Sequence, residues 1–279
     1  MANETTSSTI SELYTEIVAE ALFVASEQSI MRNLVRNYTI AGGGKSVEVP
    51  IYATVSASAV SEASDLSNTA VNPSSVTITA SEVGIMTTLT DLARNSASRN
   101  VAGDIGRLFG EAIARKLDAD LSALFTGFST EKAGGAGQEL TVQDIFEASA
   151  ELRTANAPAP YYGVFHPKQI FNVKKSLTNT FVGRDTELSN EAMRSGFVGS
   201  IAGVQIFESS NISVDGSDDS IGGVFSQDAL ALAMMQDLKI ESQRDASLRA
   251  DEIVATAVYG VSEIHDSYGV NLTADTLAT

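Results

Sequence analysis

The chain has 279 residues, of which 43% are hydrophobic and 19% are charged, and this balance predicts a packed globular protein rather than a disordered one. Its 18 Lys and Arg residues against 35 Asp and Glu give a formal net charge of -17, which argues against tight binding of DNA or RNA because such binding needs clustered cations. The sequence contains no cysteine, which excludes disulfides and thiolate metal sites.

Nothing in the sequence directs the chain to a membrane or out of the cell. The start, Met1 to Glu4, lacks the basic and apolar regions of a signal peptide. The longest purely apolar run, residues 229–235, is far shorter than the roughly 20 residues that a bilayer span needs. We therefore expect a soluble protein that is made inside the cell and has no membrane partner.

The N-terminal segment predicts an amphipathic helix over residues 9–25. Leu13, Ile17 and Leu22 recur at helical spacing, and Thr9 followed by Glu12 fits a capping box. Apolar residues continue through 30–38. This pattern is typical of an arm that packs on another surface.

Residues 42–92 predict a long hairpin. Three glycines break the chain, and the strand that follows, 47–52, contains Pro50, which cannot donate a ladder hydrogen bond and so favours an edge strand or an isolated ribbon. Residues 54–75 are mostly Ser, Ala, Thr and Asn, after which apolar alternation returns at 76–80 and 83–89. Because such a polar segment is unusual inside a compact domain, we expect the hairpin to project from the body.

The strongest helical pattern covers residues 95–126, which would span roughly 45 Å at a rise of about 1.5 Å per residue. Ile113, Leu117 and Leu121 lie on its apolar face, and Gly127 ends it. The charged residues expected to face outward are Asp104, Glu111, Arg115 and Asp118.

The second half of the chain predicts shorter elements. Thr141 is placed to cap a helix, and Pro167 suits the first turn of another. The predicted helices cover residues 142–155 and 167–177, and the predicted strands cover 161–165, 204–207, 224–225 and 253–264. Residues 229–234 form a short apolar segment, and residues 178–198 form a polar loop.

Two loops resemble ligand-binding motifs without completing them. Gly44, Lys45 and Ser46 match the end of a phosphate-binding loop, but Thr39 stands where the earlier glycine belongs and the loop leads into a strand. Residues 211–222 resemble a calcium loop that ends on glycine instead of glutamate. A flexible hinge and a solvated acidic turn explain the two loops better.

The two histidines, His166 and His265, belong to no metal-binding or nucleophile motif. A catalytic histidine needs a nucleophile and an orienting acid nearby, and the sequence proposes neither. His166 precedes a proline at a helix start, which predicts a role in the turn. We therefore predict no catalytic site, no metal and no cofactor.

Four phrases of the second half occur together in one known family. They are YGVFHP at 162–167, GSIAGVQI at 199–206, VFSQDALA at 224–231 and YGV at 259–261. Their order, together with the arm, hairpin and long helix before them, resembles the major capsid proteins of tailed bacteriophages. The resemblance covers nearly the whole chain.

The resemblance implies an α+β fold of the Hong Kong 97 type with five segments. These are an N-terminal arm at 1–41, an extended hairpin (the E-loop) at 42–92, a peripheral domain with a spine helix at 93–138, an axial domain at 139–245 and a return to the peripheral domain at 246–279.

The resemblance also implies a function, that of a major capsid protein. Such a protein self-assembles through pentamers and hexamers into the icosahedral shell of the virion, and lies in the host cytoplasm before assembly. Scaffolding, portal and decoration proteins are implied as further partners, and the packaged DNA is enclosed without sequence-specific binding. The residues implied to contact neighbouring subunits are Glu62, Asp65, Leu66 and Asn68 at the E-loop tip and Leu13, Ile17 and Leu22 in the arm.

Two departures from the family and two alternatives stay open. Only about 40 residues precede the E-loop, which implies a separate scaffolding protein or none, and no lysine lies between Ser46 and Asn95 to join subunits covalently. An encapsulin-like nanocompartment protein that encloses a cargo enzyme would share the fold. An enzyme with an unrecognised site is the other alternative, and the missing catalytic constellation counts against it.

Overall fold

The computed structural model describes residues 29–41, 44–52, 55, 57, 59–61, 65, 70–96, 101–132, 135–181 and 199–276. Within its helices, the side chains of 94–96, 101–103 and 176–181 fall outside this description. The helix predicted over residues 9–25 therefore lies outside the described residues. So do residues 182–198 of the loop predicted over 178–198, whose first four residues, 178–181, are instead helical.

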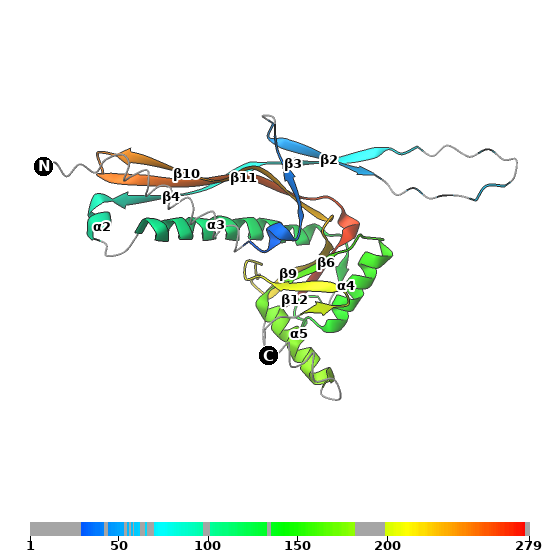
Figure 1. Cartoon of the computed structure of the whole chain (residues 1–279). Helices are drawn as coiled ribbons and strands as arrows, with labels where there is room; N and C mark the ends of the chain where they lie inside the picture. Colours follow the sequence, from blue (N-terminus) through cyan, green and yellow to red (C-terminus); the bar gives the residue numbers. More distant parts are fainter. Residues whose placement is uncertain are drawn as a thin grey trace.

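A four-stranded sheet in the order β1-β10-β11-β4 forms the long layer of the molecule (Figure 1). β1 runs parallel to β10, and the other neighbours are antiparallel. The strands are β1 (Arg36–Thr39), β4 (Ser81–Thr90), β10 (Leu230–Asp245) and β11 (Ala250–Glu263).

A long helix, α3 (Val101–Ala123), lies along this sheet (Figure 1). Phe109, Ile113, Leu117 and Leu121 recur every fourth residue, so they share one face, and all four are buried in a core with apolar residues of β10 and β11. Around α3 lie the short elements η1 (Met31–Asn33), α2 (Asp91–Ser96) and η2 (Leu124–Gly127).

A six-stranded sheet in the order β5-β12-β9-β6-β8-β7 forms a second unit. Its strands are β5 (Glu131–Lys132), β6 (Tyr161–Phe165), β7 (Ser200–Ile201), β8 (Val204–Glu208), β9 (Asp219–Ser226) and β12 (Gly269–Asp275), the last preceded by η3 (Asp266–Tyr268). Its helices are α4 (Val142–Thr154) and α5 (Pro167–Phe181). Both begin where the sequence predicts.

Hydrogen bonds at the start of α4 explain why this helix begins at Val142. The Thr141 hydroxyl accepts the Asp144 N–H at 3.4 Å, and the Asp144 carboxylate accepts the Thr141 N–H at 2.7 Å. This reciprocal capping box satisfies two N–H groups that the first helical turn would otherwise leave unpaired. The predicted cap is confirmed.

The two sheets share one apolar core at their junction. Phe125 of η2 packs on Phe225 of β9 with ring centroids 5.5 Å apart, and both side chains are buried. Gly223 makes this approach fit, because a Cβ at that position would lie 2.7 Å from the Phe125 ring. One apolar cluster therefore includes side chains of both the long layer and the six-stranded unit.

A two-stranded ribbon projects from this body (Figure 1). β2 (Ser46–Tyr52) pairs with β3 (Pro73–Thr79) in antiparallel register, with Ser46 opposite Thr79 and Tyr52 opposite Pro73. The sheet has only these two strands, so the isolated ribbon predicted from Pro50 is confirmed.

Several elements differ from the prediction. β4, predicted as part of the hairpin, pairs with β11 in the four-stranded sheet. The single helix predicted over 95–126 is two helices, α2 and α3, followed by η2. The apolar segment 229–234 opens the 16-residue strand β10, whose first four residues are all buried, so that this stretch lacks the alternation of a strand in its sequence.

Two strands lie in a different sheet from the one that the predicted segment boundaries would give them. β10 lies in the four-stranded sheet although it falls within 139–245, and β12 lies in the six-stranded sheet although it falls within 246–279. The chain thus leaves the second unit after β9 and returns to it in β12. Among the described residues, no helix is long and apolar enough to cross a membrane.

Candidate functional site

The ribbon of β2 and β3 has buried side chains at its base and exposed apolar side chains further out. Val49 and Ile78, on its inner face, are buried in a small core with alanines of β10. Further out, apolar side chains are exposed, namely Tyr52, Val55, Val60 and Val71. A thin ribbon cannot cover such side chains itself, so the outer part is a candidate contact surface.

The residues predicted to contact neighbours fall mostly outside the described part. Asp65 is described and is exposed. Glu62, Leu66 and Asn68 of the hairpin tip lie outside the described residues, as do Leu13, Ile17 and Leu22 of the arm. Their role in contacts stays a prediction.

The end of the predicted arm is built into the subunit's own core. Met31, Leu34 and Val35 are buried against α3, and β1 then joins the edge of the four-stranded sheet beside β10. Arg36 forms an ion pair with Asp228 at 2.9 Å. Residues 29–40 are therefore an integral part of the subunit.

The outward orientation predicted for Asp118 of α3 is wrong. We expected this residue to face outward, but it is 1% exposed and lies against the chain at Ser29. Oδ1 accepts the Ser29 hydroxyl at 2.8 Å and the Met31 N–H at 3.2 Å, and Oδ2 accepts the Ile30 N–H at 3.2 Å. The helical pattern alone could not reveal this, because the donors lie almost ninety positions away in the sequence.

The carboxylate of Asp118 also reaches the second unit. The Asn211 side-chain amide, in the loop between β8 and β9, donates to Oδ2 at 3.5 Å. Burial raises the pKa of the Asp118 carboxyl, while the hydrogen bonds from Ser29, Ile30, Met31 and Asn211 oppose that rise. One buried acid therefore connects α3, the end of the arm and the six-stranded unit.

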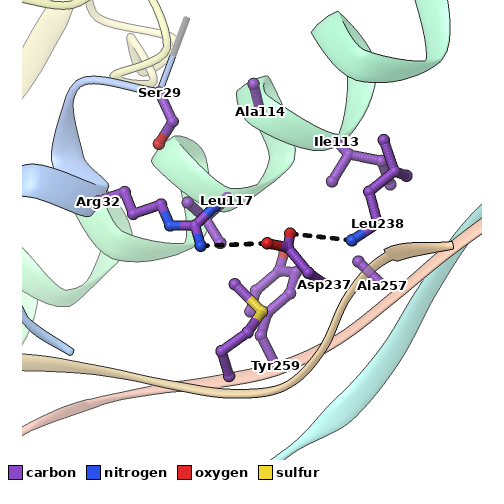
Figure 2. Close-up of a pocket in the computed structure, with 10 residues that line it drawn as sticks. Ser29, Arg32, Ile113, Ala114, Leu117, Asp237, Leu238, Ala257 and Tyr259 are labelled. Carbon is purple, nitrogen blue, oxygen red and sulfur yellow. Dashed lines mark hydrogen bonds and ion pairs between the residues drawn. The ribbon is translucent and has the colours of Figure 1, made fainter. Parts of the chain in front are cut away.

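An ion pair holds the next turn of the arm (Figure 2). Arg32 Nη2 lies 3.3 Å from Asp237 Oδ2, and the other Asp237 oxygen accepts the Leu238 N–H at 2.9 Å. Asp237 lies where the pairing of β10 with β11 shifts register, and such a bulge re-aims side chains. The pocket between them, also lined by Ser29, Ile113 and Tyr259, holds about 20 Å³, which is room for a single water molecule.

Two further residues that the sequence analysis considered as ligand-binding or catalytic candidates, His166 and Asp215, form hydrogen bonds within turns. His166 Nδ1 accepts the Lys168 N–H at 3.3 Å in the first turn of α5, and the Asp215 carboxylate accepts the N–H groups of Ser217 and Asp219. Both turn roles predicted from the sequence are confirmed. In the described part of the chain, no three histidine or acidic side chains gather as a metal site would require.

The arrangement is thus a two-sheet body with a long helix, a projecting ribbon and an anchored arm. The sequence pattern of the phage capsid protein family matches residues 73–270, well over half of the chain. The chain belongs to the phage capsid protein family. This family provides structural proteins of the capsid, and the predicted family is confirmed.

Several solved structures share the fold of this family member. The capsid of the cyanophage P-SCSP1u matches with a TM-score of 0.70 at 19% identity, covering 88% of both chains. A structure from Mycobacterium phage Che8 matches at 0.66 and 23% identity, covering 82% of this chain and 84% of that one. The capsid of a native GTA particle matches at 0.70 and 13% identity, covering 89% and 90%.

These likenesses confirm the α+β capsid fold predicted from the sequence. They favour a phage capsid over the encapsulin-like alternative. None of the curated proteins compared with the chain is similar to it in sequence.

Proposed function

We propose that this capsid protein is the major building block of its shell and self-assembles through pentamers and hexamers around a tailed phage genome. The observation that carries the proposal is the projecting ribbon, whose outer part exposes Tyr52, Val55, Val60 and Val71. Because these apolar side chains are exposed in the described part of the chain, burying them against a neighbour would stabilise an assembly.

The residues predicted to contact neighbours lie in the tip of the hairpin and in the arm. The ribbon tip, with Glu62, Asp65, Leu66 and Asn68, is the part of the hairpin furthest along the chain from its buried base at Val49. We assign these residues, and Leu13, Ile17 and Leu22 of the arm, to contacts with neighbouring subunits. Scaffolding, portal and decoration proteins stay predicted partners, as does the host cytoplasm as the site before assembly.

The acidic net charge of the chain supports the proposal that the shell encloses the genome without binding its sequence. A chain with a net charge of -17 repels phosphates overall, which argues against tight or sequence-specific binding of the enclosed DNA. The same acidity keeps unassembled subunits apart until apolar contacts form.

Sedimentation tests the role of the ribbon. Purified wild-type chain should sediment as capsomers or shells, and the double variant Tyr52→Ser, Val71→Ser should sediment as smaller species. Val214→Ser, which changes an exposed valine in the turn before β9, is the control and should assemble normally. Equal assembly of the double variant and the wild type would count against the ribbon as a contact surface.

A further inference from the structure

The outer strands of the two large sheets differ in length. In the described part of the chain, the six-stranded sheet ends on β5 and β7, which have two residues each, and one edge of the four-stranded sheet is the four-residue β1. The other edge of that sheet is β4, with ten residues (Figure 1). An unpaired edge offers backbone groups to another strand, and proteins commonly limit this by keeping edge strands short. Among these described edges, β4 is the one that is not short.

The pairing of β4 with β11 shows which backbone N–H groups point away from the sheet. The Asp91 N–H, directly after β4, donates to the Arg249 carbonyl oxygen at 3.0 Å, and β4 pairs with β11 in unbroken register. Hydrogen-bonded positions alternate along an antiparallel pair, so the odd-numbered residues of β4 direct their N–H groups to β11. The even-numbered residues direct theirs to the free edge, namely Glu82, Gly84, Met86 and Thr88.

The side chains of β4 do little to protect this edge. Glu82 is the only charged residue of the strand, which contains neither lysine nor proline, the residues that natural edge strands use to prevent pairing. No residue of β4 is buried, and Met86 is 60% exposed. The opposite edge strand, β1, carries Arg36 instead. The edge of β4 is therefore open to pairing with a strand from another chain.

The ribbon of a second copy of this chain suits the edge of β4. The ribbon of the same subunit cannot reach it, because β3 leads through Ala80 into β4 and the two lie on opposite sides of that residue (Figure 1). β2 and β3 have seven residues each and pair only with each other among the described strands. Copies with a net charge of -17 repel each other least where carboxylates are few, and β3 has no charged residue.

We propose that the free edge of β4 is an assembly surface, on which a strand of the ribbon of a second copy pairs through main-chain hydrogen bonds. This inference rests on the proposed function and names the surface that receives the ribbon. Strand addition takes its affinity from backbone groups, so β4 needs outward N–H and C=O groups rather than a particular side chain. A contact between unlike surfaces of two copies also suits rings, because such contacts can close by rotation.

Two neighbouring proline substitutions separate edge pairing from folding. Thr88→Pro removes an outward N–H group and leaves the ladder to β11 intact, whereas Thr87→Pro removes a donor to β11. Thr88→Pro should melt close to the wild type but yield about tenfold fewer shells, the effect of losing about one hydrogen bond at each contact. Thr87→Pro should melt clearly lower. Normal shells from Thr88→Pro, or equal destabilisation by both prolines, would overturn the proposal.

Hydrogen exchange of the wild-type chain tests the same edge without a substitution. In unassembled subunits, roughly half of the β4 amides should be protected, because alternate N–H groups donate to β11. In shells, nearly all of them should be protected, because the ribbon strand accepts the outward ones. Equal protection of β4 in subunits and shells would overturn the proposal even if Thr88→Pro failed to fold.

Engineered cysteines identify the strand on the edge, because the chain has no cysteine of its own. Shells of the double variant Thr88→Cys, Ser75→Cys, treated with a short bis-maleimide, should give covalent multimers on a denaturing gel. Each single variant should stay a single band. Multimers from either single variant would mean that like strands meet, and no multimers from the double variant would mean that the ribbon lies elsewhere; both results contradict the proposal.

The failure of this inference is distinguishable from the failure of the proposed function. A wild-type chain that forms no shells would contradict the proposed function itself. Shells in which the β4 amides gain no protection would contradict only the pairing of the ribbon with β4.

Discussion

At the residue scale, close packing and buried charge decide what each position tolerates. Gly223 lies where the Phe125 ring leaves no room for a Cβ, and Asp118 lies where three donors need an acceptor. Neither requirement is visible in the local sequence pattern, because each depends on a partner from a distant element.

Replacing Gly223 with alanine tests the packing of the two sheets. The added methyl would lie 2.7 Å from a ring that is itself fully buried, so we expect a loss of about 2 kcal/mol in the free energy of unfolding. Gly216→Ala is the control, since no atom lies within 4 Å of its added Cβ. Chemical denaturation of both variants measures the difference, and equal stability would show that the junction is looser than described.

A pair of acids near the same junction predicts a dependence on pH. Burial and the nearby carboxylate of Asp266 raise the pKa of Glu263 above its ordinary value. The folded state therefore binds this proton more tightly than the unfolded state does, and the stability of the fold falls as pH rises through the raised pKa.

The variant Glu263→Gln removes the free-energy cost of holding a charged carboxylate at this site in the folded state. At pH 7 it should be more stable than the wild type by about 0.5 kcal/mol, a small value because the side chain is only partly buried and solvent screens its charge. The gain should disappear toward pH 4, where the wild-type carboxyl is protonated. Thermal unfolding across this range measures it, and Glu82→Gln on β4 controls for the loss of one negative charge. A gain that is constant with pH would contradict the assignment.

At the element scale, the ribbon and the core are separable. The register of β2 with β3 ends at Tyr52 and Pro73, so residues 53–72 lie beyond the paired strands. Val49 and Ile78, which tie the ribbon to the body, lie inside the paired part. The outer segment therefore contributes little to folding.

Deleting residues 53–72 and joining the strands through Asn-Gly tests this separation. The two-residue turn suits the twist of a hairpin, and a shorter loop does not raise the entropy cost of closure. We expect near-native circular dichroism and a loss of assembly. A deletion variant that unfolds would place the segment in a core, and one that builds normal shells would remove its role in assembly.

Elements whose signals are local could be predicted from the sequence. The cap at Thr141, the helix start at Pro167 and the ribbon around Pro50 follow from neighbours a few residues away, and the structure confirms them. β10 and the buried Asp118 could not be predicted in this way. The start of β10 is buried on both faces and therefore has no alternation, and a buried acid is recognised only by its distant donors.

At the scale of the whole molecule, the subunit exposes apolar side chains in more than one region. Large apolar side chains are exposed on the ribbon and also on the long layer, among them Met86, Leu92 and Leu248. Isolated exposed apolar residues are ordinary, but a thin ribbon that exposes several of them is typical of a surface that becomes buried. We expect neighbouring subunits in the shell to cover these side chains.

The composition predicts that the shell is held without covalent links. The chain has no cysteine, and the hairpin has no lysine after Lys45. Assembled particles that are boiled in detergent should therefore give one band near 29.3 kDa on a denaturing gel. A ladder of heavier species would reveal a covalent link between subunits.

Electron microscopy of the purified, negatively stained wild-type chain tests self-assembly into a shell most directly. The protein, expressed alone or with a scaffolding protein, should form closed particles or rings with fivefold and sixfold symmetry, because we propose that neighbouring subunits bury the apolar side chains that the ribbon exposes. Particles that remain single subunits under all conditions, with the ribbon ordered, would contradict the account.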